Sequence, residues 1–328
     1  FDIKELDTLS TLATTKRGVM AAHPAFTSDG RVWNMISYFG PRVKNELVSF
    51  DESAQHTTQH VMTRPKLYYF HSFGNTGRYF VTIEMPMYLS FWKLIVSGAA
   101  NKSFYECFEW DRAAANIFHI FDRQTGALTI IDSTLQFFYF HTINTYDEDG
   151  KLVIELCGYD NNKIIDDFYL ATMTTTGIPE EHKSSLRRIT LDLAQSAATM
   201  ENLNVNFELP NINLGYAGAR HRYAYGVQSS NGCRMLSDSI AKYDFEKRQQ
   251  TIWKEKHLIP GEPIFIAAPN AKREDDGVLL VVCHDSKKHT ACLVVLDAQD
   301  LRQIAVTYTP KHIPVSLHGF FYHGRRLA

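Results

Sequence analysis

Four of the fourteen histidines stand in similar surroundings, each at the end of an apolar or aromatic run. The local sequences are Ala-Ala-His-Pro, Tyr-Phe-His-Ser, Tyr-Phe-His-Thr and Ser-Leu-His-Gly, around His23, His71, His141 and His318. Imidazole is the commonest metal ligand that proteins offer. Histidines so far apart in the chain can share one ion only if separate structural elements aim them at a common point. Such convergence would make a metal centre, whereas each histidine taken singly also fits a hydrogen-bonded core or turn position.

The other histidines lack such surroundings. His56 and His60 have the i,i+4 spacing of a helical metal pair, but they lie in a polar stretch with no third ligand nearby. We therefore expect them in a solvated loop. Five more neighbour arginine, lysine or turn residues and are expected at the surface: His221, His284, His289, His312 and His323.

The composition excludes several classes of protein. Acidic and basic residues are interspersed and leave a formal net charge of −2, which offers no basic surface for nucleic acid. No run of about 18 uncharged apolar residues is present that would be long enough to span a bilayer. The sequence also lacks the short motifs of serine hydrolases, nucleotide-binding loops and zinc metalloproteases.

The cysteines and the chain start indicate the compartment and the domain organisation. The five cysteines are scattered and include no CxxC pair, so a reducing, cytoplasmic location fits best. The chain begins at Phe1 rather than Met, and its first residues lack the basic start and apolar run of a signal peptide. No linker-like or low-complexity stretch divides it. We interpret residues 1–328 as one domain that is incomplete at its N-terminus.

Short apolar and aromatic runs recur along the chain and predict β-strands at Lys66–Phe70, Tyr79–Glu84, Ala127–Ile131, Leu152–Cys157, Gly277–Cys283 and Ala291–Leu296. Glycine supplies the positive φ of tight turns between such strands, as expected at Ser28-Asp29-Gly30, Thr125-Gly126, Asp149-Gly150 and Asp276-Gly277. Only two short patches have helical character, Tyr88–Ala99 and Pro179–Ser185. The pattern predicts an all-β fold, and its many hairpins fit either a sandwich pair or a propeller.

The sequences around the four histidines are similar to the iron-ligand signatures of the carotenoid oxygenase family and follow the same order along the chain. The resemblance extends to five further blocks: Tyr105–Glu109, Phe207–Asn213, Tyr223–Gly226, Gly261–Phe265 and Glu274–Gly277. It covers nearly the whole chain. It is closest to the animal branch, which contains carotene-cleaving dioxygenases and the retinoid isomerohydrolase of the visual cycle.

The resemblance implies a seven-bladed β-propeller whose first strands are missing from this chain, with short helices in loops that cap one face. It also implies an Fe2+ cofactor on the propeller axis, coordinated by His23, His71, His141 and His318. Imidazole suits iron(II), and a ligating histidine commonly donates its second N–H to a carboxylate. By family position, Glu208 would serve His141 and Glu262 would serve His318. The acid that serves the second histidine of the family would lie before Phe1.

The activity implied by the resemblance is oxidative cleavage of a carotenoid double bond, in which both atoms of O2 enter two aldehyde or ketone products. Two alternatives stay open. A retinoid isomerohydrolase would use the same iron to polarise a retinyl ester without consuming O2. A carotenoid-binding or retinoid-binding protein would keep the scaffold without turnover. The partners expected are an apolar polyene and, for the oxygenase, O2.

The segment Met85–Ala99 is apolar but too short to span a bilayer, and it carries aromatic and basic residues suited to an interface. It resembles the membrane-dipping patch of the family. The resemblance therefore implies a peripheral contact with a membrane, and substrate access, at Phe91, Trp92, Leu94 and Ile95. The alternative is a strand and helix buried within the core.

Overall fold

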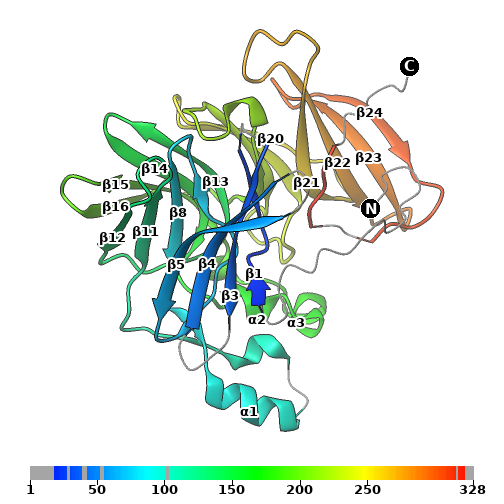
Figure 1. Ribbon diagram of the computed structural model, residues 1–328. Coiled ribbons are helices and arrows are strands. Elements are labelled where there is room, and N and C mark those ends of the chain that lie inside the picture. The colour runs from blue at the N-terminus through cyan, green and yellow to red at the C-terminus, as the bar shows by residue number, and fades with distance from the viewer. Residues whose placement is uncertain are drawn as a thin grey trace.

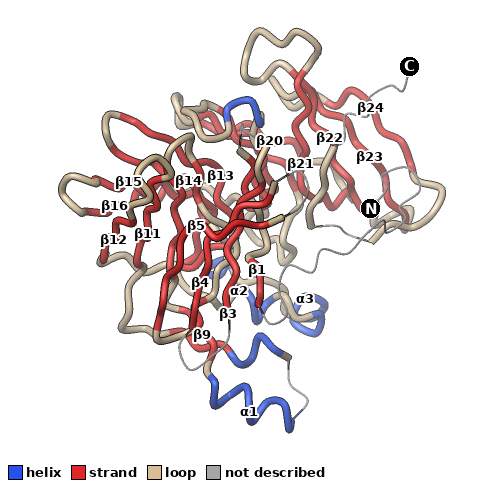
Figure 2. Tube along the Cα trace, in the orientation of Figure 1, coloured by secondary structure: helices blue, strands red, loops and turns tan. Residues whose placement is uncertain are grey.

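A computed structural model describes residues 18–27, 30–38, 43–51, 55–100, 103–314 and 317–321, the side chains of residues 97–100 excepted. β-Strands dominate this part of the chain and the helices are few and short, so the all-β prediction is confirmed. The strands form six sheets, and within the described residues none of the six closes on itself (Figure 1 and Figure 2).

The first three sheets come from the N-terminal part of the chain. The first contains β1 (Gly18–Met20), β2 (Ala25–Phe26), β3 (Val32–Tyr38), β4 (Val43–Phe50) and β5 (His56–Arg64). The second contains β6 (Leu67–Tyr68), β9 (Met87–Leu89) and β10 (Phe108–Trp110). The third contains β7 (Gly74–Asn75), β8 (Tyr79–Glu84), β11 (Ile117–Asp122) and β12 (Leu128–Asp132).

The last three sheets are antiparallel meanders of four consecutive strands. The fourth contains β13 (Phe138–Glu148), β14 (Lys151–Tyr159), β15 (Ser185–Asp192) and β16 (Ala197–Asn202). The fifth contains β17 (Glu208–Asn211), β18 (Tyr223–Gln228), β19 (Ser239–Asp244) and β20 (Gln249–Trp253). The sixth contains β21 (Leu258–Ala267), β22 (Gly277–Asp285), β23 (Thr290–Asp297) and β24 (Gln303–Tyr308).

The α-helices gather at one end of the molecule, the lower end in Figure 1. They are α1 (Phe91–Ala100), α2 (Ile164–Asp167) and α3 (Leu170–Thr175), and the 3-10 helices are η1 (Phe104–Cys107), η2 (Glu180–His182) and η3 (Leu214–Tyr216). Since β9 and β10 pair with each other, α1 and η1 form an excursion between them. The helical patch expected at Tyr88–Ala99 is largely α1, whereas Pro179–Ser185 contains only η2.

The sheets pack through their apolar faces. The largest cluster of buried side chains joins the third and fourth sheets and includes Ile83, Phe118 and Ile154. A second cluster joins the fifth and sixth sheets around Tyr225 and Leu279. Each inner strand is therefore held by side chains from a neighbouring sheet as well as by its own backbone ladder.

Two of the predicted glycine turns are confirmed and one is wrong. Gly126 and Gly150 have positive φ, at 74° and 77°, and connect paired strands as predicted. The turn predicted at Asp276-Gly277 is wrong, because Gly277 is the first residue of β22 and a loop of nine residues precedes it. A Cβ at this glycine would lie against the carbonyl oxygen of Ile266, so close approach of two backbones explains the residue. The turn predicted at residues 28–30 lies mostly outside the described residues.

Candidate metal centre

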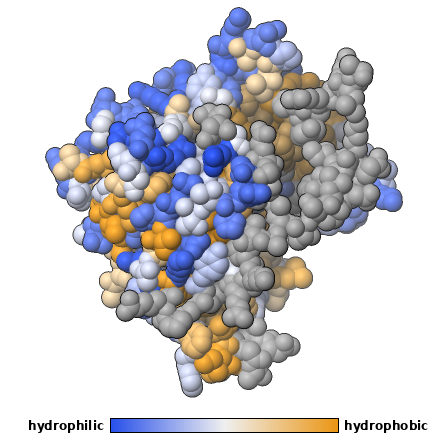
Figure 3. Space-filling view, viewed as in Figure 1, coloured by the Kyte–Doolittle hydropathy of each residue, from blue (hydrophilic) through white to orange (hydrophobic). Residues whose placement is uncertain are grey.

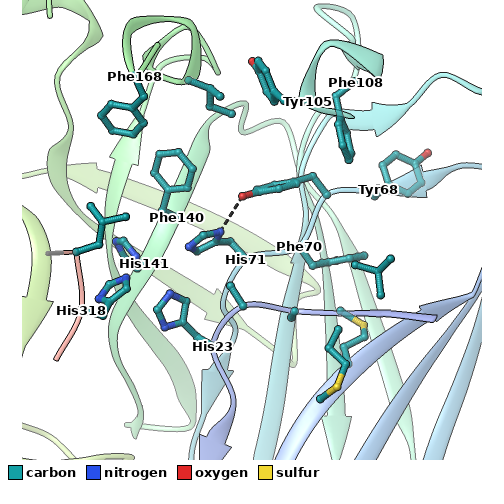
Figure 4. A pocket seen from close by; sticks show the side chains of 18 of the residues that line it. His23, Tyr68, Phe70, His71, Tyr105, Phe108, Phe140, His141, Phe168 and His318 are labelled. Atoms are coloured by element: carbon teal, nitrogen blue, oxygen red, sulfur yellow. Dashed lines mark hydrogen bonds between the residues drawn. The ribbon is translucent and has the colours of Figure 1, made fainter. Parts of the chain in front are cut away.

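Four histidines from distant parts of the chain meet at one point. They lie between β1 and β2, between β6 and β7, within β13 and after β24. The ring centroid of His23 is 4.9 Å from those of His71 and His141 and 4.8 Å from that of His318. Figure 4 shows the four rings turned toward a common centre. The structure thus brings together all four residues that the sequence analysis singled out.

The spacing of the nitrogens suits one ion. One ring nitrogen from each of His23, His71 and His141 lies within 4.8 Å of the others. Two nitrogens bonded to the same ion at about 2 Å lie roughly 3–4 Å apart. A contraction of about an ångström therefore suffices to bring the three into one coordination sphere. The Nε2 of His141 is buried and meets no hydrogen-bond partner among the described residues, as expected for a lone pair reserved for a cation.

Irregular strand pairing aims several of these side chains. The register of β13 against β14 shifts between Tyr139 and Thr142, a stretch that contains His141, and again between Thr142 and Asn144. The pairing of β17 with β18 shifts next to Glu208, and that of β21 with β22 shifts between Pro260 and Pro263. A bulge rotates the side chain that it contains away from the regular alternation. The site is therefore built where the ladders are interrupted.

Glu208 is buried beside His141. Its Oε2 is 2.7 Å from Nδ1 of His141, and its Oε1 accepts a hydrogen bond of 2.7 Å from the hydroxyl of Tyr159. The backbone N–H of Leu209 also donates to Oε2. Burial alone raises the pKa of Glu208, but His141 and these hydrogen bonds outweigh burial and lower it. The ionised carboxylate requires the proton on Nδ1 of His141, which leaves Nε2 free to bind a metal.

Glu262 lies beside His318 in a looser arrangement. Its Oε1 is 3.4 Å from Nδ1 of His318, whose side chain is 39% exposed, and the N–H of Gly319 donates to Oε2 over 2.8 Å. Hydrogen bonding to Glu262 raises the pKa of His318. Both glutamates thus contact the histidines that the family resemblance assigns to them, at different distances and degrees of burial.

The remaining two histidines are largely removed from water. Burial, followed by the proximity of His141, lowers the pKa of His71 to about 3 and that of His23 to about 4. Both rings are therefore neutral at pH 7, the state in which imidazole binds a metal. The Nδ1 of His71 is 2.7 Å from the hydroxyl of Tyr69. Sequence reasoning missed Tyr69, although its place two residues before a candidate ligand puts it on the same face of an extended segment.

An apolar cavity of about 610 Å³ opens onto the histidines. Its walls are mostly aromatic and aliphatic, and the four histidines and Glu208 also line it. The aromatic side chains that surround it in Figure 4 are Tyr68, Phe70, Tyr105, Phe108, Phe140 and Phe168. A cavity of this size and lining suits an elongated apolar ligand whose reactive part lies near the imidazoles. None of the six was predicted, because aromatic residues are equally common in ordinary β-cores.

Three of the four residues expected to contact a membrane are exposed, and the fourth packs against the core. Phe91, Trp92 and Ile95 of α1 are 71%, 72% and 56% exposed. Leu94 instead packs inward against a buried cluster that contains Leu89. The lower end of the molecule, over α1, carries a hydrophobic surface in Figure 3. Among the described residues, no helix has the length and apolar character needed to cross a bilayer.

Some expectations for the other histidines were wrong. His56 and His60 belong to β5 rather than to a loop, so their side chains do not have helical spacing. His221 is 5% exposed and its Nε2 is 3.2 Å from the carboxylate of Glu155, whereas the preceding Arg220 points to solvent. A charged neighbour in sequence therefore did not indicate exposure, because consecutive side chains of an extended segment point in opposite directions.

Comparison with known proteins agrees with the class of protein that the fold and site define, an all-β protein with four histidines at the end of an apolar cavity. The family model described as retinal pigment epithelial membrane protein (RPE65) matches residues 1–323. The chain belongs to this family, that of the carotenoid oxygenases.

Individual relatives cover most of the chain. It is 28% identical over 356 residues to the mitochondrial carotenoid-cleaving dioxygenase of Macaca fascicularis, covering 92% of this chain and 63% of the relative. The carotenoid isomerooxygenase of Galleria mellonella is 30% identical over 325 residues, with the same coverage. The cobalt-substituted apocarotenoid oxygenase of Synechocystis has a similar fold, with a TM-score of 0.81 and 24% identity, over 92% of this chain and 64% of that chain. The chain thus spans less than two thirds of the length of these relatives.

Proposed function

We propose that the protein is a non-haem iron(II) dioxygenase that cleaves a double bond of a carotenoid with O2 and releases two aldehyde or ketone products. The observation that carries this proposal is the meeting of four imidazoles at the end of an apolar, aromatic cavity. The names of the relatives, which include carotenoid-cleaving dioxygenases and a carotenoid isomerooxygenase, supply the reaction class.

In this proposal His23, His71, His141 and His318 hold Fe2+. When bound, iron(II) supplies the site that binds and activates O2, which does not react with a polyene unaided. Neutral imidazoles would leave the charge of the ion uncompensated, and Glu208 and Glu262 provide negative charge beside two of the ligands, His141 and His318. A relative prepared with cobalt supports the ability of such a site to hold a divalent ion.

The protein's own part in the reaction is binding, orientation and exclusion of water. The apolar walls of the cavity favour a conjugated chain over water, and aromatic rings such as Phe140 and Phe168 pack against polyenes. The cavity opens onto the four histidines, so an extended substrate that fills it would place a double bond beside them. Glu208 holds the proton on Nδ1 of His141 and so keeps Nε2 directed at the ion.

We further propose that substrate is taken from a membrane surface by a cytoplasmic protein. Phe91, Trp92 and Ile95 present an apolar face on α1, and Phe104, which is half exposed in the adjoining η1, lines the cavity. The membrane contact would therefore lie beside one wall of the substrate cavity. Leu94 is excluded from this contact by its packing.

For the fold of the whole protein we propose a single-domain seven-bladed propeller, to which residues 1–328 contribute the larger part. Six sheets in the described residues, and a structural relative of which this chain covers 64%, support this proposal.

The test uses the full-length protein, stripped of metal and reloaded with Fe2+. We expect O2 consumption with β-carotene, and both atoms of 18O2 recovered in the two carbonyl products. His71→Asn should abolish iron binding and turnover. His289→Asn is the matched control, because His289 is exposed and its φ of 53° is one that asparagine tolerates. Hydrolysis of a retinyl ester without O2, or stoichiometric iron with polyene binding but no product, would overturn the proposal.

A further inference from the structure

We infer that Tyr159 is a positioning residue of the metal centre, whose hydroxyl holds Glu208 in the orientation that fixes His141. This inference rests on the proposed function in one respect, namely that His141 binds a metal. It assigns a role to a residue of the cavity wall that the motifs of the sequence did not indicate.

The contact links two sheets. Tyr159 is the last residue of β14 in the fourth sheet, and Glu208 is the first residue of β17 in the fifth. The tyrosine is 2% exposed and the glutamate 4% exposed. The hydroxyl donates to Oε1 over 2.7 Å, whereas His141 contacts the other oxygen, Oε2. Three groups from two sheets therefore form one chain of hydrogen bonds, from phenol to carboxylate to imidazole.

The two oxygens of Glu208 receive different donors. Oε2 accepts from Nδ1 of His141 and from the backbone N–H of Leu209. Among the described residues, the hydroxyl of Tyr159 is the donor to Oε1. A buried carboxylate oxygen without a donor is costly and favours either rotation of the group or its protonation. Loss of the hydroxyl would therefore weaken the hold of Glu208 on the Nδ1 proton of His141.

Tyr159 is suited to this role because it stays protonated. Burial raises its pKa well above the ordinary value, and the negative charge of Glu208 raises it further. The phenol is therefore protonated and able to donate at neutral pH. It adds a hydrogen bond to the carboxylate without adding a charge to the metal centre.

The ring of Tyr159 has a separate function that must be kept apart from that of the hydroxyl. It lines the apolar cavity and contacts the rings of Phe138 and Phe140, with centroid distances of 5.9 and 5.7 Å. A role in packing alone would be retained by phenylalanine, which keeps the ring and loses only the oxygen. Tyr159→Phe thus separates the two functions.

The experiment measures metal affinity without turnover. Full-length apo-protein is titrated with Co2+ in competition with a chelator, and the visible absorption of bound cobalt reports on the ligand field. We expect Tyr159→Phe to bind Co2+ about tenfold more weakly than the wild type, the lower end of the range for partners of ligating histidines, with a shifted cobalt spectrum. Tyr225→Phe is the matched control: this tyrosine is 1% exposed and donates to the carbonyl of Ala298 over 3.0 Å. It should lose stability but keep full affinity.

A double-mutant cycle tests whether Tyr159 acts through Glu208. In a Glu208→Gln background, Tyr159→Phe should change the Co2+ affinity by less than about twofold, because the coupled partner is already altered. Equal affinity of Tyr159→Phe and wild type, or additive losses in the double variant, would overturn the inference. A wild type that binds cobalt but cleaves no polyene would overturn the proposed function alone, and a wild type with no affinity for metal would overturn both.

Discussion

His23 and His71 are joined through the main chain as well as through the position of their rings: the backbone N–H of His23 donates to the carbonyl oxygen of His71 over 3.1 Å. The loop between β1 and β2 is thereby tied to the segment between β6 and β7. Since the two ring centroids are 4.9 Å apart, this backbone contact brings two of the four imidazoles together before any ion is bound. Such preorganisation reduces the conformational entropy lost on metal binding.

Glu208 and Glu262 should differ in how strongly each affects the affinity for the metal. Glu208 is buried with a contact of 2.7 Å to His141, whereas Glu262 is 3.4 Å from a half-exposed His318. We expect Glu208→Gln to lower the affinity for Fe2+ about 10–100-fold and Glu262→Gln to lower it less, because solvent screens the outer pair. Iron stoichiometry after dialysis against a graded chelator measures both. Equal losses in the two variants would contradict this ranking, and unchanged iron and turnover in both would remove the glutamates from the site.

Packing behind the site should also affect the metal. A Cβ on Gly226 of β18 would lie 2.6 Å from the ring of Phe207 and 2.8 Å from the carbonyl oxygen of Glu208. Gly226→Ala must therefore displace the strand that carries Glu208. We expect a loss of about 1–3 kcal/mol in the free energy of unfolding together with weaker binding of Fe2+. Gly77→Ala is the control, since beyond the two adjacent residues no described atom lies within 4 Å of its added methyl group. Unaltered metal affinity in the Gly226 variant would show that Glu208 tolerates movement of its strand.

The exposed face of α1 should mediate membrane contact. Trp92→Glu combined with Ile95→Glu should reduce flotation of the protein with liposomes severalfold, because two charges would replace apolar side chains at the interface. Ile252→Glu, on β20, alters another exposed apolar residue and should leave flotation unchanged. Thermal unfolding of all three proteins checks that the fold is retained. Equal flotation of the α1 variant and the wild type would rule out this helix as the contact.

Acid should destabilise the protein in part through Asp238. Burial raises the pKa of this carboxyl group, but hydrogen bonds from Lys254 and Ser230 outweigh burial and lower the pKa to about 2. Because the unfolded chain has a pKa of 3.8, the stabilisation is fully present above pH 3.8 and is lost as the pH falls toward 2. The contribution is on the order of 1–2 kcal/mol after screening around the half-exposed lysine.

Urea unfolding at pH 5 and at pH 3 measures this contribution. Asp238→Asn should be less stable than the wild type at pH 5 and should lose less stability between the two pH values. Asp132→Asn, which alters an exposed carboxylate of β12, should follow the wild type. A slope of the Asp238 variant equal to that of the wild type would place the acid sensitivity elsewhere.

Local sequence predicted the strands better than their connections. The runs at Tyr79–Glu84 and Gly277–Cys283 are strands because alternation and β-branched residues act within a few positions. The loop before Gly277 was not predicted. Glycine is needed at this position because the backbone of the neighbouring strand approaches closely, and not because the chain turns there. Contacts between chain segments far apart in sequence decide such positions, and they leave no local signal.

In the candidate site, too, residues with a local sequence signal were predicted and residues defined by distant contacts were missed. The four histidines and two glutamates were found because a family resemblance marks them by their neighbours. Tyr69 was missed although it lies two residues before His71, a spacing that puts both side chains on one face of an extended segment. Tyr159 was not found, because nothing near it in sequence distinguishes a tyrosine that donates to a buried acid from one that fills a core. The burial of His221 was missed for a similar reason, since its partner Glu155 lies in another strand.

The positions of His23 and His318 have a consequence for assembly. One lies near the beginning of the described chain and the other near its end, and their rings are 4.8 Å apart. A single ion held by both would connect two segments that lie far apart in the sequence. An ion that binds only the folded chain stabilises it by mass action. In the proposed iron enzyme, the iron supply during synthesis would therefore affect the amount of folded protein in the cell as well as its activity.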